Sequence, residues 1–207
     1  MQIQHSIIQL AGHSLQRVDF DPVTFQPEDL LWLPHYAQLT DGSRKRQTEH
    51  LAGRIAAVYA LQEVGEKDVP AIGDERQPLW PAPWYGSISH CERSALAVVS
   101  AQPIGVDIER IMTPSLAADL ESSIINSEEK SLLAASGLTP ELALTLAFSA
   151  KESAFKACPL RVQAGIGFTD FKLVCIKEGN LLLRLSATEY RLQWIKAAEY
   201  VITLSAS

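Results

Sequence analysis

Two acidic residues, Asp107 and Glu109, stand in the short run IGVDIE. In this run the apolar residues Ile104, Val106 and Ile108 alternate with Gly105, Asp107 and Glu109. That alternation predicts a β-strand with one face in the core. Residues i and i+2 of a strand point to the same side, about 7 Å apart. Oxygen ligands at this spacing suit Mg²⁺, which commonly takes one or two carboxylates and completes its shell with phosphate oxygens and water. A solvated strand end is the alternative interpretation of the pair taken alone.

A second chemical group lies in KESAFK, where Glu152 and Lys156 are neighbours at i and i+4 of a predicted helix. On a protein surface such an ion pair would stabilise the helix by only about 0.3 kcal/mol. Thr145 and Ser149 extend the two residues into a polar stripe on a helix otherwise rich in Leu, Ala and Phe. We expect a polar stripe on a largely buried helix to face a cavity or a ligand.

Basic residues form a third group, because Arg46, His50 and Arg54 are spaced by four and share one helix face. Arginine binds phosphate bidentately with its planar fork. His90, in the run SISHC, could donate to a phosphate at a junction of loop and strand. The alternatives are a solvated helix face and a packed histidine. Together the groups suit a phosphorylated substrate held by cations at its far end and by Mg²⁺ at the reacting centre.

The elements that must position these residues follow from periodicity and from helix-end signals. A first long helix is predicted from about Ser43 to Val64, and a second begins with Thr139 as N-cap and Pro140 and ends before Pro159. Shorter helices are predicted around Pro34, which breaks the first of them, and as a pair in 116–136, the second with Ser127 as N-cap. Strands are predicted in the runs GSISH, SALAVVS and IGVDIE. The β-rich runs of the second half predict an antiparallel meander, and they are GFTDFKLVCI, NLLLRLS, YRLQWI and EYVITLS. Each half therefore combines a long helix with strands. We predict an α+β fold of two similar lobes, residues 1–102 and 103–207.

Composition narrows the functional class. A formal net charge of −6 argues against a nucleic-acid-binding protein. Three cysteines without zinc-like spacing suit a reducing compartment. The first residues lack the features of a signal peptide, and no run approaches the roughly 18 apolar residues of a membrane span. We expect a cytoplasmic monomer without a membrane span, and its association with a synthase complex near the inner membrane is left open.

The run GVDIE followed by FSAKESAFKA, and preceded by SISHC, resembles the signature motifs of the Sfp-type phosphopantetheinyl transferases. The likeness extends across nearly all of the chain. It implies a pseudo-twofold α+β fold with each lobe a long helix packed on an antiparallel sheet, and an active site at the interface of the lobes. It also implies that the 4′-phosphopantetheine arm of coenzyme A is transferred to a serine of apo carrier proteins, with release of 3′,5′-ADP.

The resemblance further implies roles for particular residues. Mg²⁺ would be held by Asp107, Glu109 and Glu152, and catalysis would involve Glu152, Lys156 and His90. Coenzyme A would be bound mainly by the N-terminal lobe, and the residues implied to bind it are Arg46, Arg54, Arg76, Ser89, His90 and Lys156. Arg76 stands in Arg76-Gln77-Pro78, where the family has a lysine, and Phe148 stands where many relatives have tryptophan.

The implied partners are aryl and peptidyl carrier proteins or domains of a nonribosomal peptide synthetase, in siderophore biosynthesis of the enterobactin type. The segment from Met112 to Ser136 is expected to dock the carrier through apolar side chains, namely Ile111, Met112, Leu116, Ile124 and Ile125, unless these cover the core instead. Two other functional classes remain open from the residues alone. One is another Mg²⁺-dependent phosphoryl or nucleotidyl transferase or phosphatase, and the other is a non-enzymatic binding module.

Overall fold

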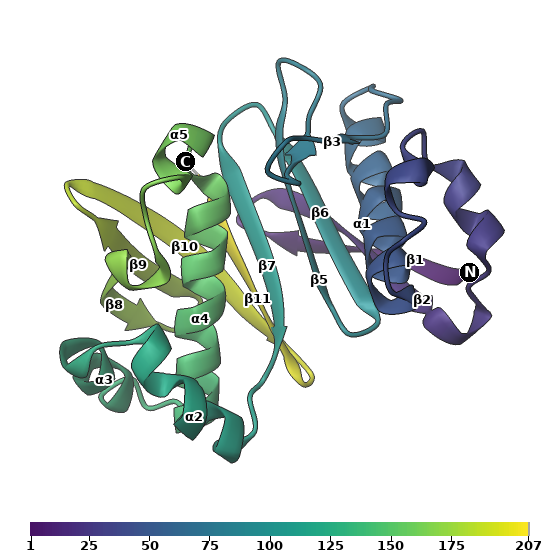
Figure 1. The fold of residues 1–207 in the computed structure, drawn as a ribbon. Helices are drawn as coiled ribbons and strands as arrows, with labels where there is room; N and C mark the ends of the chain where they lie inside the picture. The colour runs from purple at the N-terminus through teal and green to yellow at the C-terminus, as the bar shows by residue number, and fades with distance from the viewer. Residues whose placement is uncertain (207) are drawn as a thin grey trace. The chain divides into compact units, whose positions relative to one another are not determined.

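Antiparallel sheets and two long helices make up the chain, shown in Figure 1 as a computed structural model that describes residues 1–206. The backbone divides into two units, the first from Met1 to Gln102 and the second beginning at Pro103. The predicted α+β class is confirmed, and each unit contains one long helix packed on one antiparallel sheet. Among the described residues, no helix is long and apolar enough to cross a membrane.

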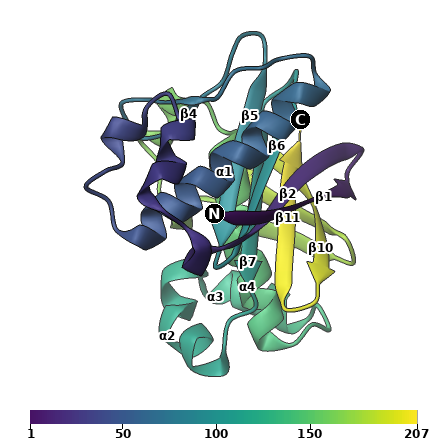
Figure 2. The same ribbon diagram turned by 90° about the vertical axis from the view of Figure 1, so that its right-hand side faces the viewer.

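The first unit is a four-stranded antiparallel sheet in the order β1-β2-β6-β5, with helix α1 packed against it. Its main elements are β1 (Gln2–Leu10), β2 (His13–Asp21), α1 (Arg44–Glu63), β5 (Tyr85–Cys91) and β6 (Ser94–Ser100). Alanines at one face of α1 allow close packing on Val18, Phe20 and the alanines of β6. Figure 2 shows β1 and β2 as the purple hairpin of this sheet.

Shorter elements connect the strands of the first unit to α1. They are the 3₁₀ turns η1 (Pro22–Thr24), η2 (Pro27–Trp32) and η3 (Tyr36–Gln38), and a small two-stranded sheet of β3 (Ala71–Ile72) and β4 (Pro78–Leu79). The predicted short helix broken at Pro34 is therefore present as two 3₁₀ turns on either side of that proline. A second apolar cluster, formed by Phe25, Leu30, Leu33, Leu39 and Leu51, packs these turns on α1.

The second unit is a five-stranded antiparallel sheet in the order β7-β11-β10-β9-β8. Its strands are β7 (Ile104–Arg110), β8 (Lys172–Lys177), β9 (Asn180–Leu185), β10 (Thr188–Ala197) and β11 (Tyr200–Ala206). Its helices are α2 (Pro114–Ile124), α3 (Ser127–Ala134), α4 (Pro140–Ala157), α5 (Leu160–Gln163) and the 3₁₀ turn η4 (Phe168–Asp170). The predicted meander is confirmed for β8 to β11.

Local signals predicted the two long helices well. The Ser43 side chain accepts a hydrogen bond from the Arg46 backbone at the start of α1, and Thr139 precedes Pro140 at the start of α4. Three details were wrong. The N-cap of α3 is Asn126 rather than Ser127, Phe168–Asp170 form a 3₁₀ turn rather than part of a strand, and Gln2–Asp21 form a hairpin that was not predicted.

A buried ion pair joins α3 to α4. The Lys151 ammonium, wholly buried, lies 2.9 Å from a carboxylate oxygen of Glu129 and donates to the Ile124 carbonyl at 2.6 Å. The same Glu129 carboxylate accepts from the backbone N–H of Asn126 and of Leu173. This one carboxylate therefore connects the start of α3, the start of β8 and the middle of α4.

The expected carrier-docking side chains lie mostly in the core of the second unit. Ile124 and Ile125 are buried, so their prediction as docking residues is wrong. Ile111 and Met112 are partly buried against the same core, whereas Leu116 remains 44% exposed. The reason is that α2 and its flanking residues pack on α4, and the apolar residues of the segment supply that contact.

Candidate active site

An acidic cluster forms where α4 runs along β7 (Figure 1). The close approach of the two elements depends on Gly105. A Cβ at this position would lie 1.9 Å from the Ser153 carbonyl oxygen, so any side chain would push the helix away from the strand. Glycine in IGVDIE therefore sets the distance at which side chains of α4 can reach those of β7.

Asp107 extends from β7 on the same side as Gly105, as the alternation of a strand requires. It is 2% exposed, and its Oδ1 accepts a hydrogen bond from the Lys156 ammonium at 2.7 Å. Lys156 also donates to the Val106 carbonyl at 3.3 Å. The structure thus brings together two of the predicted site residues across 49 positions of the sequence.

Most of the polar stripe of α4 forms hydrogen bonds within the fold. Thr145 accepts from the Met112 backbone N–H, and the Ser149 hydroxyl lies 2.9 Å from that of Thr203, the cross-strand neighbour of Asp107. Ser153 bonds to the same threonine hydroxyl. The expectation that Thr145 and Ser149 face a cavity is therefore wrong. Glu152 and Lys156 are the part of the stripe that keeps partial exposure.

Three carboxylates of the second unit interact electrostatically. Burial raises the pKa of Glu109 to about 7, with Asp107 adding to the rise, Lys156 opposing it and Glu152 adding a smaller part. Burial also raises the pKa of Glu152, which Lys156 lowers and Asp107 raises further. Asp107, Glu109 and Glu152 therefore share one lysine, which leaves two negative charges unbalanced when all three are ionised.

The carboxylates of Asp107, Glu109 and Glu152 are chemically suited to bind a divalent cation. Hard cations such as Mg²⁺ prefer carboxylate oxygens, and two positive charges would balance the excess of the cluster. Within residues 1–206, however, no three His, Cys, Asp or Glu side chains already converge as a ligand set. Lys156 holds Asp107 Oδ1, so we expect ion binding to require that this lysine shifts or shares the carboxylate.

Metal-free protein should lose stability as the pH rises, because of Glu109. Its pKa is about 7 in the folded protein, above the ordinary 4.5, so the folded state binds more protons between these values. The free energy of unfolding therefore falls as pH rises through this window. We expect Glu109→Gln to remove part of the fall in Tm between pH 5.5 and 8 in the presence of a chelator.

The exposed Glu178→Gln serves as the matched control and should follow the parent protein. Mg²⁺ added to the parent at pH 8 should restore stability, whereas Glu109→Gln should gain less. An unchanged pH profile in Glu109→Gln would show that Glu109 ionises without hindrance and that the carboxylates are not coupled.

A cluster of cationic and histidine side chains forms the candidate phosphate site of the first unit. Arg54 is 5% exposed, donates to the Ala71 carbonyl at 3.4 Å, and has a buried Nε without a partner. Burial lowers the pKa of Arg54 to about 10, so the guanidinium keeps its charge at neutral pH. A buried cation with an unused donor is suited to an anionic ligand.

Two histidines adjoin this arginine. The Nε2 atoms of His35 and His50 lie 2.9 Å apart. Burial, followed by Arg54, His35, Arg46 and His90, lowers the pKa of His50 to about 3, and burial with Arg54 lowers the pKa of His35. Both rings are therefore neutral at pH 7, and Arg54, Arg46 and His90 all contribute to the lowered pKa of His50. His35 was not among the predicted site residues, because no spacing rule relates it to α1.

The remaining predicted residues of this unit are less closely grouped. Arg46 is exposed on the first turn of α1, and His90 Nδ1 lies 3.8 Å from Glu49 of α1. Ser89 is buried and, as the neighbour of His90 on a strand, points to the opposite face. Arg76 is exposed in the turn between β3 and β4 with a φ of 63°.

Arg44, two positions before Arg46 in the sequence, has a structural role. Its guanidinium donates to the carbonyls of Pro22, Val23 and Phe25 and lies 5.4 Å from the centre of the Phe25 ring. It therefore fixes η1 to the start of α1.

Comparison with known proteins shows the family to which the chain belongs. Residues 35–100 match the 4′-phosphopantetheinyl transferase N-terminal domain, and residues 103–205 match the 4′-phosphopantetheinyl transferase superfamily. Enterobactin synthase component D of Escherichia coli strain K12 is 53% identical over 204 residues, covering 99% of this chain and 98% of that protein. Its namesake from Salmonella typhi is 50% identical over 212 residues, covering 99% and 90%. The 4′-phosphopantetheinyl transferase PptT of Mycobacterium tuberculosis is 35% identical over 89 residues, 40% of this chain and 39% of that protein.

The two matched domains occur in order, and the similarity to the enterobactin synthase components extends over almost all of both sequences. The family resemblance of the motifs is thereby confirmed. The chain belongs to the 4′-phosphopantetheinyl transferase superfamily and is an enzyme of that class.

Proposed function

We propose that this transferase moves the 4′-phosphopantetheine of coenzyme A to a serine of the carrier proteins of an enterobactin-type synthase. The observation that carries the proposal is the carboxylate cluster of Asp107, Glu109 and Glu152 around Lys156. Such a cluster is suited to phosphoryl transfer, in which catalysis consists mainly of positioning and charge stabilisation. The similarity to the enterobactin synthase components supports the choice of carrier.

In the proposed reaction the serine Oγ attacks the phosphorus that bears pantetheine. The bond from this phosphorus to the bridging oxygen breaks, and that oxygen leaves with 3′,5′-ADP. Mg²⁺ held by Asp107, Glu109 and Glu152 would supply charge neutralisation at the pyrophosphate. Lys156, whose ammonium already donates a hydrogen bond to Asp107, would donate to the transferring phosphate.

Glu152 is the proposed acceptor of the serine proton. Burial raises its pKa, although Lys156 opposes the rise, and a higher pKa makes a carboxylate a better base near neutrality. A water oriented by Glu152 would serve as the alternative acceptor. In the second route the water would pass a proton on to the Glu152 carboxylate, and both routes leave the carrier serine esterified.

The adenosine end of coenzyme A would be held by the first unit. Arg54 supplies the buried charge, and Arg46 and His90 extend the cationic group from α1 and β5. Ser89 joins the proposed set because it matches a family motif, and Arg76 because it stands where the family has a lysine. We place the reaction in the cytoplasm, as the sparse cysteines of the sequence suggest.

Arg54→Gln should raise the KM for coenzyme A by about 10- to 100-fold, the cost of losing a charge-assisted hydrogen bond. The KM for the carrier should stay unchanged, because Arg54 supplies binding of coenzyme A only. Steady-state kinetics below the Tm of the variant check this, with the exposed Lys67→Gln as control. A change confined to the carrier KM would instead assign α1 to carrier recognition.

The choice of carrier is tested by presenting apo aryl and apo peptidyl carrier domains side by side with coenzyme A and Mg²⁺. We expect both domains of an enterobactin-type synthase to be modified, at a kcat/KM well above that of an unrelated acyl carrier. Preference for the unrelated carrier would contradict the assignment to siderophore synthesis while leaving the transferase activity intact.

A further inference from the structure

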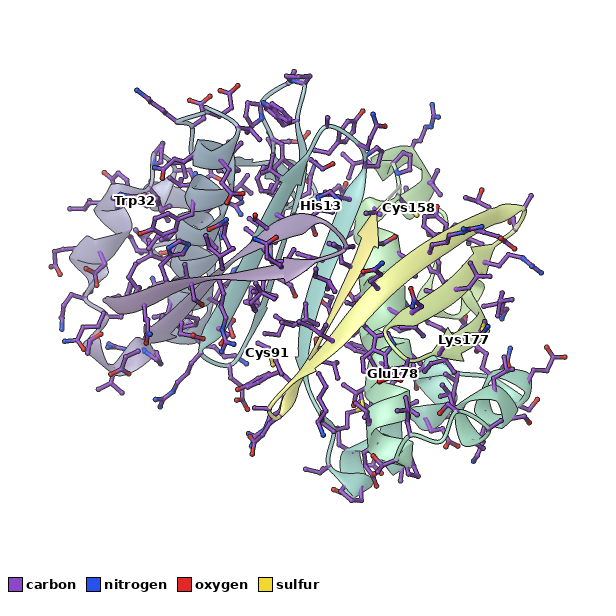
Figure 3. All side chains as sticks on the ribbon, turned by 180° about the vertical axis from the view of Figure 1, so that it is seen from behind. His13, Trp32, Cys91, Cys158, Lys177 and Glu178 are labelled. Atoms are coloured by element: carbon purple, nitrogen blue, oxygen red, sulfur yellow. The ribbon has the colours of Figure 1, made fainter. Side chains whose placement is uncertain are left out.

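Thr203 of β11 lies opposite Asp107 of β7, as its cross-strand partner in the second sheet. Residues directly opposite each other in an antiparallel pair project from the same face of the sheet, and α4 packs on this face. Figure 3 shows β10 and β11 in front of α4, with Cys158 labelled just past the end of the helix. Thr203 is wholly buried, so its side chain can affect the reaction only through the neighbours that it contacts.

Two serines of α4 bond to this threonine. The Thr203 hydroxyl donates to the Ser149 carbonyl at 2.9 Å, and the Ser149 hydroxyl lies 2.9 Å from the Thr203 hydroxyl. The Ser153 hydroxyl lies 2.7 Å from the same hydroxyl oxygen and 3.0 Å from the Thr203 carbonyl. A hydroxyl has one hydrogen to give and two lone pairs. Because Thr203 gives its hydrogen to a carbonyl of the helix, its oxygen is the acceptor for the serine hydroxyls.

These bonds fix the position of α4 along its own axis. The close contact at Gly105 determines how near the helix comes to β7, because the helix backbone occupies the space that a side chain would need. Such a contact between smooth backbones still allows the helix to slide. Hydrogen bonds weaken steeply away from their preferred distance and angle, so the bonds of both serines to one hydroxyl oppose sliding.

The helix face that bonds to Thr203 also carries two residues of the candidate active site. Glu152 and Lys156 lie three or four positions from one or the other of the two serines, and residues at this spacing share a helix face. The strand side of the same contact is Thr203, directly opposite Asp107. The hydroxyl of Thr203 therefore relates the position of Glu152 and Lys156 to that of Asp107.

We propose that Thr203 is a positioning residue for the transfer reaction, whose hydroxyl holds α4 where Glu152 and Lys156 reach Asp107. The inference rests on the proposed carboxylate site, because it concerns the separation of members of that site. The bond from Lys156 to Asp107 is 2.7 Å long, so a small slide of the helix would break it. A displacement of about 1 Å can lower the rate of an enzyme by about 100-fold.

Thr203→Val tests the role, because valine keeps the shape of the side chain and removes only the hydroxyl. At saturating carrier and below the Tm of the variant, we expect kcat to fall by about 10- to 100-fold, with the KM for coenzyme A nearly unchanged. Thr203→Ser keeps the hydroxyl and should recover most of the rate. Thr145→Val is the matched control, since it removes another wholly buried hydroxyl, which bonds to the Met112 N–H, and it should keep the parental kcat.

A double variant separates positioning from stability. Thr203→Val should lower the Tm, because it leaves the Ser149 hydroxyl buried without this partner. Adding Ser149→Ala removes that hydroxyl, so the Tm should recover in part. The kcat of the double variant should stay low, since the bond between helix and strand is still missing. A kcat that recovers together with the Tm, or a parental kcat in Thr203→Val, would overturn the proposal.

Titration with Mg²⁺ in the absence of coenzyme A gives a second measurement that does not depend on turnover. An ion that binds the folded state raises the Tm. We expect Mg²⁺ to raise the Tm of chelator-treated parent protein and of Thr145→Val, and to raise it less in Thr203→Val and in the double variant. Equal rises in all four proteins would overturn the proposal. A parent protein that neither responds to Mg²⁺ nor modifies a carrier would instead contradict the proposed function, and this inference with it.

Discussion

Asp107→Asn is expected to lower kcat/KM for carrier modification by about 10³-fold, the size of effect seen when a preorganised electrostatic group is removed. The substitution keeps the shape of the side chain but removes the charge that holds Lys156 at 2.7 Å and that would hold a metal ion. Asp107 is 2% exposed, so the loss cannot be offset by solvent.

The fold should tolerate this change, because the amide can still accept a hydrogen bond from Lys156. Circular dichroism and Tm therefore provide the structural check, and the exposed Asp68→Asn is the matched activity control. Full activity of Asp107→Asn at ordinary Mg²⁺ concentration would exclude Asp107 from the metal site. If Asp107→Asn loses activity and its Tm also collapses, the experiment would be repeated with Asp107→Glu. This variant should bind the ion with altered geometry and recover a measurable rate.

Lys151→Met is expected to lower the free energy of unfolding by about 3–5 kcal/mol, because it leaves Glu129 as an unpaired buried charge. Lys151 is wholly buried and Glu129 is 2% exposed. Combining the change with Glu129→Gln should recover part of the loss. The amide oxygen can still accept from a backbone N–H, and the buried charge is gone.

Urea denaturation measures these changes. The control is Lys130→Met, which breaks the exposed pair of Lys130 with Glu121 and should cost less than about 1 kcal/mol. Similar losses for Lys151→Met and Lys130→Met would contradict the account of the buried pair. Because Lys151 precedes Glu152 on α4, a loosened helix should also reduce activity in the single variant more than in the double variant.

Local patterns were sufficient for most elements of the second unit. Alternation identified β7, and Thr139 with Pro140 identified the start of α4. The first hairpin escaped prediction because β1 is exposed on both faces, so its sequence carries no alternation between core and solvent. Asn126 and Ser127 are both good N-caps, and only the reciprocal bonds of Asn126 with Glu129 decide between them.

The candidate site was predictable in its residue types but not in its contacts. DxE spacing places two carboxylates on one side of a strand, whereas the bond between Asp107 and Lys156 depends on how closely α4 packs at Gly105. Polar residues on α4 looked functional as a stripe, yet Thr145 and Ser149 satisfy buried partners within the fold. Long-range packing, which residue spacing does not encode, decides which polar residues of α4 bond within the fold and which belong to the candidate site.

The proposed reaction is tested most directly by the products formed from coenzyme A, Mg²⁺ and an apo aryl carrier. Intact-mass spectrometry of the carrier and chromatography of the nucleotide would follow both products of one turnover. The account predicts a carrier heavier by one phosphopantetheine and an equal amount of 3′,5′-ADP, with neither product in the presence of a chelator. Metal-dependent consumption of coenzyme A with an unmodified carrier would contradict it and would indicate a hydrolase or a nucleotidyl transferase.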